Sequence, residues 1–213
     1  LSKEINLILR DDDKIYGGTN NSGEGSGDWL DFSLLTTNSG VKVDILDQQN
    51  ALFETTDASV VTTHNQSISG IENIVGTGKG DKITGTSSAN TIIGGGGNDT
   101  IYGTDGENKL YGNEGDDTFY SGAGSDTIDG GAGTNTVNYI TSAHISKDIK
   151  VNLSGNVQDG IAINTAKTTE MTDTFNDIQN IITAMGNDTI WTGTGKNSIN
   201  TGAGDDTIYG SVD

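Results

Sequence analysis

The sequence predicts an all-β protein: a right-handed parallel β-roll (a β-solenoid) with two irregular β excursions. Three features of its 213 residues support this fold. Apolar residues recur every nine positions, a small acid or amide stands two positions before most of them, and glycine-rich segments separate the repeats. The register runs without a slip from Ile74 to Val137 and returns from Ile181 to Ile208. A period kept over so many repeats is typical of a repeat protein and not of a disordered chain.

Each nonapeptide is expected to form a six-residue turn followed by a three-residue strand. Glycine suits the turn because its backbone can adopt positive φ. In a triplet such as Thr100-Ile101-Tyr102 the middle residue points to one face and its neighbours to the other. Two nonapeptides make one coil, so residues 18 positions apart should lie side by side in parallel strands. The closed stack would then satisfy backbone groups that a lone strand leaves exposed.

Two stretches leave this register and correspond to each other. Asp28 to Asp81 and Asn135 to Asp188 have equal length, Leu30-Asp31-Phe32 corresponds to Val137-Asn138-Tyr139, and residues 41–45 correspond to 149–153. Ile68 likewise corresponds to Phe175. The chain is therefore interpreted as a tandem module of about 107 residues. Each excursion alternates apolar and polar residues, as strands do, and long loops near 46–67 and 154–174 are expected to pack on the roll or cap it.

These patterns divide the chain into four parts of a single continuous solenoid. Residues 1–75 hold an N-terminal strand, an isolated repeat and the first excursion, and 76–138 form the first repeat block. Residues 139–182 form the second excursion, and 183–213 form the second block. Whether residues 1–27 continue the roll or cap it stays open. The sequence begins at Leu1 and shows neither an initiator Met nor a leader segment, so we expect it to be a piece of a longer protein.

The composition excludes several classes of protein. Thirty acidic residues against 11 basic ones give a formal net charge of −19, which argues against binding nucleic acid. The chain has no cysteine for disulfides or thiolate metal sites. It also has no apolar run of about 18 residues, so no membrane insertion is expected.

The nonapeptide resembles the RTX (repeats-in-toxin) repeat Gly-Gly-x-Gly-x-Asp-x-aliphatic-x, a calcium-binding β-helix repeat. The resemblance rests on residues 94–102, 112–120 and 201–209, and it is strong over 76–138 and 183–210. It implies a bacterial protein that is exported by the type I pathway, folds outside the cell on calcium and stays secreted or at the cell surface. Several calcium ions are the implied cofactors.

In that family, each ion lies between two turns 18 residues apart and binds turn carbonyls together with both Asp side chains. Such oxygen-rich sites suit calcium, which takes six to eight oxygen ligands. Carried onto this chain, the resemblance implies metal ligands at Thr77, Lys79, Asp81, Gly94, Gly95, Gly96, Gly97, Asp99, Gly112, Asn113, Glu114, Gly115, Asp117, Gly130, Ala132, Asn135, Ala184, Gly186, Asp188, Thr201, Ala203 and Asp206.

The opposite edge of the roll mostly carries Asn where the family has Asp, and an amide oxygen lacks the charge. Weaker metal candidates there are Asn90, Thr104, Gly106, Asn108, Ser121, Ala123 and Asp126. A metal-free asparagine ladder is an equally good interpretation of this edge.

No catalytic motif accompanies the repeats, and His64 and His144 are interpreted as ordinary loop residues, so no enzyme is expected. The leading hypothesis is a calcium-binding structural module of a secreted or surface-attached protein, such as an S-layer protein or adhesin. Neighbouring copies or surface glycans are further candidate partners. One alternative is a module whose outward Thr and Tyr residues bind a glycan, a host cell or ice. Another is the C-terminal accessory region of a secreted toxin or hydrolase.

Overall fold

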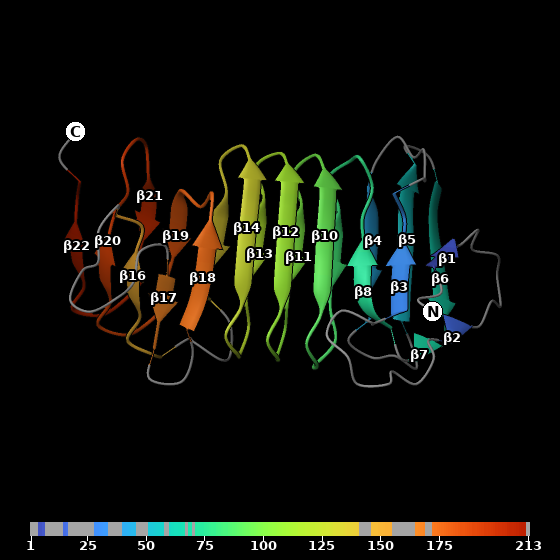
Figure 1. The fold of residues 1–213 in the computed structure, drawn as a ribbon, viewed down its shortest axis with the longest axis horizontal. Helices are drawn as coiled ribbons and strands as arrows, with labels where there is room; N and C mark the ends of the chain where they lie inside the picture. Colours follow the sequence, from blue (N-terminus) through green and yellow to red (C-terminus); the bar gives the residue numbers. More distant parts are fainter. Residues whose placement is uncertain are drawn as a thin grey trace.

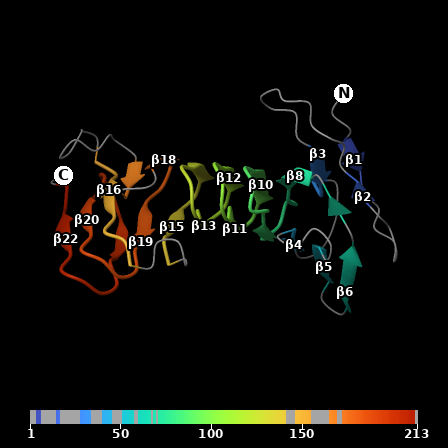
Figure 2. The same ribbon diagram turned by 90° about the horizontal axis from the view of Figure 1, so that it is seen from below.

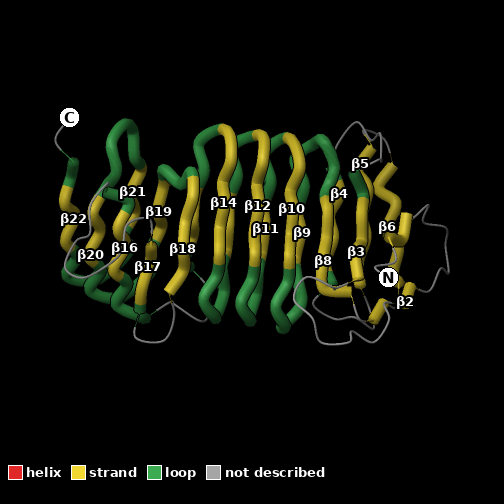
Figure 3. Tube along the Cα trace, viewed as in Figure 1, coloured by secondary structure: helices red, strands yellow, loops and turns green. Residues whose placement is uncertain are grey.

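The computed structural model describes residues 4–6, 15–16, 28–33, 40–45, 51–57, 60–66, 68–69, 71–140, 146–154, 165–168 and 172–211. All regular elements in these ranges are strands (Figure 3). They form two long sheets that face each other along an elongated roll, with β1 and β22 at opposite ends (Figures 1 and 2). The predicted all-β roll is confirmed.

The first sheet contains, in spatial order, β1 (Glu4–Asn6), β3 (Asp28–Asp31), β8 (Ile71–Val75), β10 (Thr91–Gly96), β12 (Lys109–Glu114), β14 (Thr127–Ala132), β18 (Thr172–Asn176), β17 (Thr165–Lys167), β16 (Lys150–Asn152), β20 (Thr189–Trp191) and β22 (Thr207–Tyr209). The second contains β21 (Ser198–Asn200), β19 (Asn180–Ile182), β15 (Thr136–Asn138), β13 (Thr118–Tyr120), β11 (Thr100–Tyr102), β9 (Lys82–Thr84), β4 (Val41–Asp44), β5 (Ala51–Asp57) and β6 (Val60–Gln66). A small separate sheet pairs β2 (Ile15–Tyr16) with β7 (Ile68–Ser69).

Parallel pairing in the repeat blocks has the predicted 18-residue register. Ile92 pairs with Leu110 in the first sheet, and Ile101 pairs with Phe119 in the second. The middle residue of each triplet points between the sheets, and its neighbours point outward. From Ile74 to Val137 every such apolar residue is fully buried. The core is therefore a single column of side chains, one from each nonapeptide.

The two modules pair their strands in the same way but on opposite sheets. Leu30 pairs with Ile74 as Val137 pairs with Ile181. β3, however, belongs to the first sheet and β15 to the second. The reason is that seven nonapeptides, an odd number of half-coils, separate Ile74 from Val137. The correspondence found in the sequence is thus present in the strand register.

The expectation of a long loop is wrong over much of residues 46–67. There β5 and β6 form an antiparallel hairpin, and β5 also pairs antiparallel with β4 (Figure 2). The run Val60-Val61-Thr62-Thr63 is β-branched, which favours strands. The open edge of β4 also offers unpaired backbone groups that a hairpin can satisfy.

The second excursion inserts strands within the first sheet instead. β17 pairs antiparallel with both β16 and β18, and this trio separates β14 from β20. The residues between 154 and 174 therefore also include strand, at 165–167 and from 172 onward. At the other end of the chain, β1 pairs parallel with β3 and β2 pairs parallel with β7. These described parts of residues 1–27 continue the parallel stacking.

Replacing the largest side chain of the repeat core tests the inward assignment. Phe119 is fully buried between the sheets, so Phe119→Ala should lower the free energy of unfolding by roughly 3–5 kcal/mol. The matched control is Thr118→Ala on the outward face of the same strand, which should cost less than about 1 kcal/mol. Denaturant unfolding in saturating calcium measures both, and equal losses would contradict the assignment.

Candidate functional site

The turns that join the two sheets lie along the two long edges of the roll (Figure 1). We call one edge the Asp edge, because its turns in the first block end at Asp81, Asp99, Asp117 and Asn135. The other is the Asn edge, whose turns end at Asn90, Asn108 and Asp126. Consecutive turns of an edge stack directly on each other. Gly96 N–H donates to Thr77 O over 3.0 Å on the Asp edge, and Thr104 Oγ1 donates to Thr86 O on the Asn edge.

The sixth residue of each turn binds the turn before it through a repeated hydrogen bond. On the Asp edge, the backbone N–H of Asp81 donates to Asp99 Oδ1 over 2.8 Å. The N–H of Asp99 donates in the same way to Asp117 Oδ1, and that of Asp117 to Asn135 Oδ1. The second block continues the pattern, because Asp188 N–H donates to Asp206 Oδ1. We call this series the side-chain ladder.

The ladder uses only one oxygen of each carboxylate. The second oxygen, Oδ2, is buried and accepts no hydrogen bond in Asp99, Asp117, Asp126 and Asp188. Burial, together with the charges of Asp117 and Asp81, raises the pKa of Asp99 to about 8. Burial raises the pKa values of Asp117 and Asp188 as well. Because a buried charge without a partner is costly, each of these oxygens needs a proton or a cation.

The glycines of the turns leave these oxygens room. A Cβ built on Gly94 would overlap Asp99 Oδ2, and one on Gly112 would overlap Asp117 Oδ2. A Cβ on Gly95 would overlap Thr77 O of the previous turn, and Gly95 also has a φ of 117°, which favours glycine. The turns therefore bring backbone carbonyls and carboxylates together with no side chain between them. Such an all-oxygen donor set fits a hard cation such as calcium.

The structure brings together the turns that the sequence paired. Turn 76–81 stacks on 94–99, 94–99 on 112–117, 112–117 on 130–135, and 183–188 on 201–206. Asp81 differs from Asp99, Asp117 and Asp188 because both of its oxygens accept hydrogen bonds. Val41 N–H donates to its Oδ1 over 2.6 Å and Thr77 N–H to its Oδ2 over 2.5 Å.

Asparagine fills the corresponding position differently. The Nδ2 of Asn90 donates to Glu72 O over 2.8 Å, and that of Asn108 donates to Gly106 O over 3.3 Å. On the Asp edge, Asn135 Nδ2 donates to Asp177 O over 3.1 Å. An amide thus gives hydrogen bonds to carbonyls that a cation would otherwise bind. This geometry favours a metal-free ladder at Asn90 and Asn108.

Asp126 is the exception on the Asn edge, because its Oδ2 has no partner. Its backbone N–H donates over 2.9 Å to Oδ1 of Asp173, a ladder residue that the sequence analysis missed. Burial and the charge of Asp173 raise the pKa of Asp126 to about 8, and burial raises that of Asp173 to about 6. Gln179 was missed too; its Oε1 accepts the N–H of Asn135. Asp173 lies outside the nine-residue register, although it keeps the usual spacing of two residues before an apolar residue, Phe175. Gln179 has the same spacing before Ile181, where the second run of the register begins.

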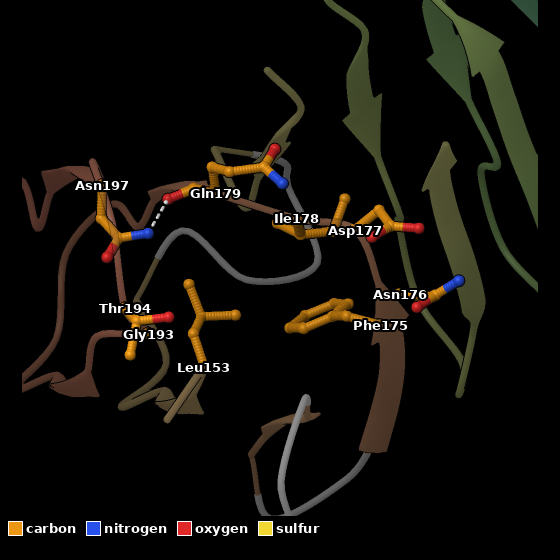
Figure 4. A pocket seen from close by; sticks show the side chains of 9 residues that line it. All are labelled: Leu153, Phe175, Asn176, Asp177, Ile178, Gln179, Gly193, Thr194 and Asn197. Carbon is orange, nitrogen blue, oxygen red and sulfur yellow. Dashed lines mark hydrogen bonds between the residues drawn. The ribbon is translucent and has the colours of Figure 1, made fainter. Parts of the chain in front are cut away.

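A pocket of about 230 Å³ lies between the turn at residues 175–179 and the turn at residues 193–197 (Figure 4). Leu153, Phe175 and Ile178 supply its apolar lining, and Asn197 Nδ2 bridges it by donating to Gln179 O over 3.0 Å. Among its described lining residues Asp177 is the only ionisable one. The pocket follows from the insertion of β16 and β17 between β18 and β20.

Within the described ranges, no group of three His, Cys, Asp or Glu side chains lies close enough together to hold a metal ion by side chains alone. The candidate sites instead combine two carboxylates with backbone carbonyls. The side chains of His64 and His144 lie outside the described part of the structure. No described helix has the length and apolar character needed to cross a membrane.

Comparison with known families agrees with this geometry. The family model of the RTX calcium-binding nonapeptide repeat, which spans 4 copies of the repeat, matches residues 75–110, 102–137 and 183–213. No curated protein matches the chain. The matched ranges contain the turns of the Asp edge from Gly76 to Asn135 and the turns of the second block. The nonapeptides that build both edges of this roll are RTX calcium-binding repeats.

Proposed function

We propose that this calcium-binding structural module belongs to a secreted or cell-surface bacterial protein of the S-layer or adhesin kind. The module folds on calcium outside the cell and then acts as a rigid spacer. The observation that carries the proposal is the row of buried Oδ2 atoms without hydrogen-bond donors at Asp99, Asp117 and Asp188. Their carboxylates lie among glycine-rich turns whose carbonyls supply further oxygen ligands.

The proposed site between turns 94–99 and 112–117 illustrates the division of labour. Asp117 Oδ1 holds the backbone N–H of Asp99, which fixes the spacing of the two turns. The Oδ2 atoms of both residues remain for a metal, together with carbonyls from Gly95, Gly97, Gly112 and Glu114. Calcium, when bound, would supply the positive charge that this buried pair lacks. Since both turns must be in place to form such a site, binding and folding are coupled.

The small core explains why folding should depend on this coupling. Each nonapeptide buries one apolar side chain, whereas ordering the backbone costs about 1–2 kcal/mol per residue. A net charge of −19 adds repulsion in the compact state. The free energy of calcium binding then becomes free energy of folding. Millimolar calcium outside the cell would therefore induce folding of a chain that is exported unfolded.

An exposed aromatic pair supports glycan binding as a second candidate function. Trp191 and Tyr209 stack with ring centroids 5.5 Å apart on the outward face of β20 and β22, and Tyr209 is 51% exposed. Tyr102 and Tyr120 stack more closely, 4.4 Å apart, and Lys82 Nζ lies 5.3 Å from the centroid of the Tyr102 ring. Tyr102 and Tyr120 are half-buried, and their contacts with each other and with Lys82 suit a sheet-stabilising role. A glycan array screened in calcium distinguishes the two functions.

Removal of calcium should largely unfold the chain at neutral pH. Without the cation, the buried carboxylates repel each other and the apolar column is too small to offset the entropy of the chain. Far-ultraviolet circular dichroism should show coil in chelator and β structure after addition of millimolar calcium. Identical β spectra in the two conditions would contradict calcium-dependent folding.

Acidification should partly replace calcium. The pKa of Asp99 rises from 3.8 to about 8 in the folded chain, so the fold favours the protonated form. This contribution to stability is complete below a pH of about 4 and is lost as the pH rises toward 8. In calcium-stripped buffer, circular dichroism should therefore show more β structure at pH 4 than at pH 8. More β structure at pH 8 would mean that the carboxylates are stabilised as anions without metal.

The two edges should respond differently to changes of charge. Asp99 faces a turn on each side, so Asp99→Asn should disturb two ions and raise the calcium concentration at the folding midpoint. Asp126→Asn should disturb one ion at most. Asn108→Asp should strengthen the Asn edge, because an added carboxylate raises affinity at an oxygen site. Isothermal titration calorimetry of the three variants measures these effects, and equal losses for Asp99→Asn and Asp126→Asn would show that both edges bind metal alike.

A further inference from the structure

A buried acidic pair lies where the first repeat block meets the second excursion. There β14 pairs with β18, a strand of the excursion, in place of a further nonapeptide strand. Asp126 immediately precedes β14, and Asp173 lies within β18. Their exposed fractions are 1% and 0%. Asp173 lies outside the residues that the RTX repeat model matches.

The hydrogen bonds of this pair leave one oxygen without a partner. Asp126 Oδ1 accepts Asn108 N–H over 2.7 Å, and Asp173 Oδ1 accepts Asp126 N–H over 2.9 Å. The hydroxyl of Tyr139, which is fully buried, donates to Asp173 Oδ2 over 2.8 Å. Asp126 Oδ2 accepts nothing. Tyr139 thus fixes the orientation of Asp173, while Oδ2 of Asp126 is buried without a partner.

The groups near Asp126 Oδ2 offer oxygen atoms that could bind a metal ion. Ser121 is fully buried, and its Oγ also lacks a hydrogen-bond partner. Burial raises the pKa of Asp173, and Ser121 lies near enough to that carboxyl group to offset part of this rise. Elsewhere on the Asn edge, the corresponding positions hold Asn90 and Asn108, whose amides donate to turn carbonyls. Two adjacent buried carboxylates cannot use that arrangement because neither can donate when ionised. Carboxylate and hydroxyl oxygens with no nitrogen or sulfur donor are typical ligands of calcium.

We propose that Asp126 and Asp173, with the Ser121 hydroxyl, bind a calcium ion that joins β14 to β18. This inference rests on the proposed calcium-dependent function and adds a site outside the nonapeptide pattern. The ion would hold the returning strand of the excursion on the first block, and so dock the second block on the roll. The first module has Phe32 and Gln66 at the positions of Tyr139 and Asp173, so its sequence lacks the groups that form this site.

Calcium stoichiometry from isothermal titration calorimetry tests the proposal. Asp173→Asn should bind one ion fewer than the unaltered chain, and so should Asp126→Asn. The double variant should also lose one ion and no more, because both carboxylates serve the same ion. The matched control is Asp129→Asn, which removes the same charge from the outward side of β14 and keeps an oxygen to accept Gly131 N–H. The control should retain every ion.

Two results would overturn the site. Full stoichiometry in Asp173→Asn would mean that the pair shares a proton and holds no metal. Loss of two ions in the double variant would mean that the two carboxylates serve separate sites. In either case calcium binding by the other turns leaves the proposed function intact, whereas a complete absence of calcium binding by the unaltered chain would refute both.

If Asp173→Asn does not fold in calcium, terbium luminescence gives an independent test. Tyr139 contacts Asp173 directly, so its excitation should sensitise a terbium ion bound by the pair. Tyr139→Phe should lower this emission more than Tyr209→Phe, a variant of an exposed tyrosine on β22. The Phe32 of the first module occupies the matching core position and is 1% exposed, so the fold accepts phenylalanine there. Equal emission from the two variants would overturn the proposal.

Discussion

The fold of this chain depends on one repeated interaction: a side-chain Oδ1 that accepts the backbone N–H of the residue 18 positions earlier. Asp99 makes this bond to Asp81, Asp117 makes it to Asp99, and Asp206 makes it to Asp188. The bond sets the distance between successive turns, as the strand hydrogen bonds do between successive triplets. It also determines the chemistry of the edge, because it occupies one carboxylate oxygen and leaves Oδ2 facing the glycine turn.

Stability and charge are therefore opposed within the same residues. The ladder stacks carboxylates that repel one another, and burial makes their ionised forms unfavourable, as the raised pKa values of Asp99 and Asp126 express. A core one side chain wide cannot offset this cost. Where the chain carries Asn, the amide donates hydrogen bonds to backbone carbonyls of the turns. We propose that such turns need no cation, so that the distribution of Asp and Asn along the roll determines which turns require metal.

The excursions show how an irregular segment can enter a solenoid without breaking it. In both modules the residues that leave the register return so that the next strand pairs correctly, as Ile74 does with Leu30 and Ile181 does with Val137. The ladder continues across the second excursion through two acceptors at irregular separations. Asp173 Oδ1 accepts the N–H of Asp126, and Gln179 Oε1 accepts the N–H of Asn135. Each places an oxygen where a nonapeptide residue would have placed one. Continuity of the ladder, more than continuity of the nine-residue register, keeps the stack intact.

The sequence by itself determined the all-β roll, the 18-residue pairing register, the inward column from Ile74 to Val137 and the family of the repeats. It could do so because each nonapeptide interacts mainly with the repeats one coil away, so the period alone defines the contacts. It also revealed the correspondence of the two modules. Only the tertiary structure decided the hairpin of β5 and β6, the insertion of β16 and β17, and the place of Asp173 beside Asp126. Those contacts join segments at irregular separations, such as the 47 residues between Asp126 and Asp173, and no period in a sequence encodes them.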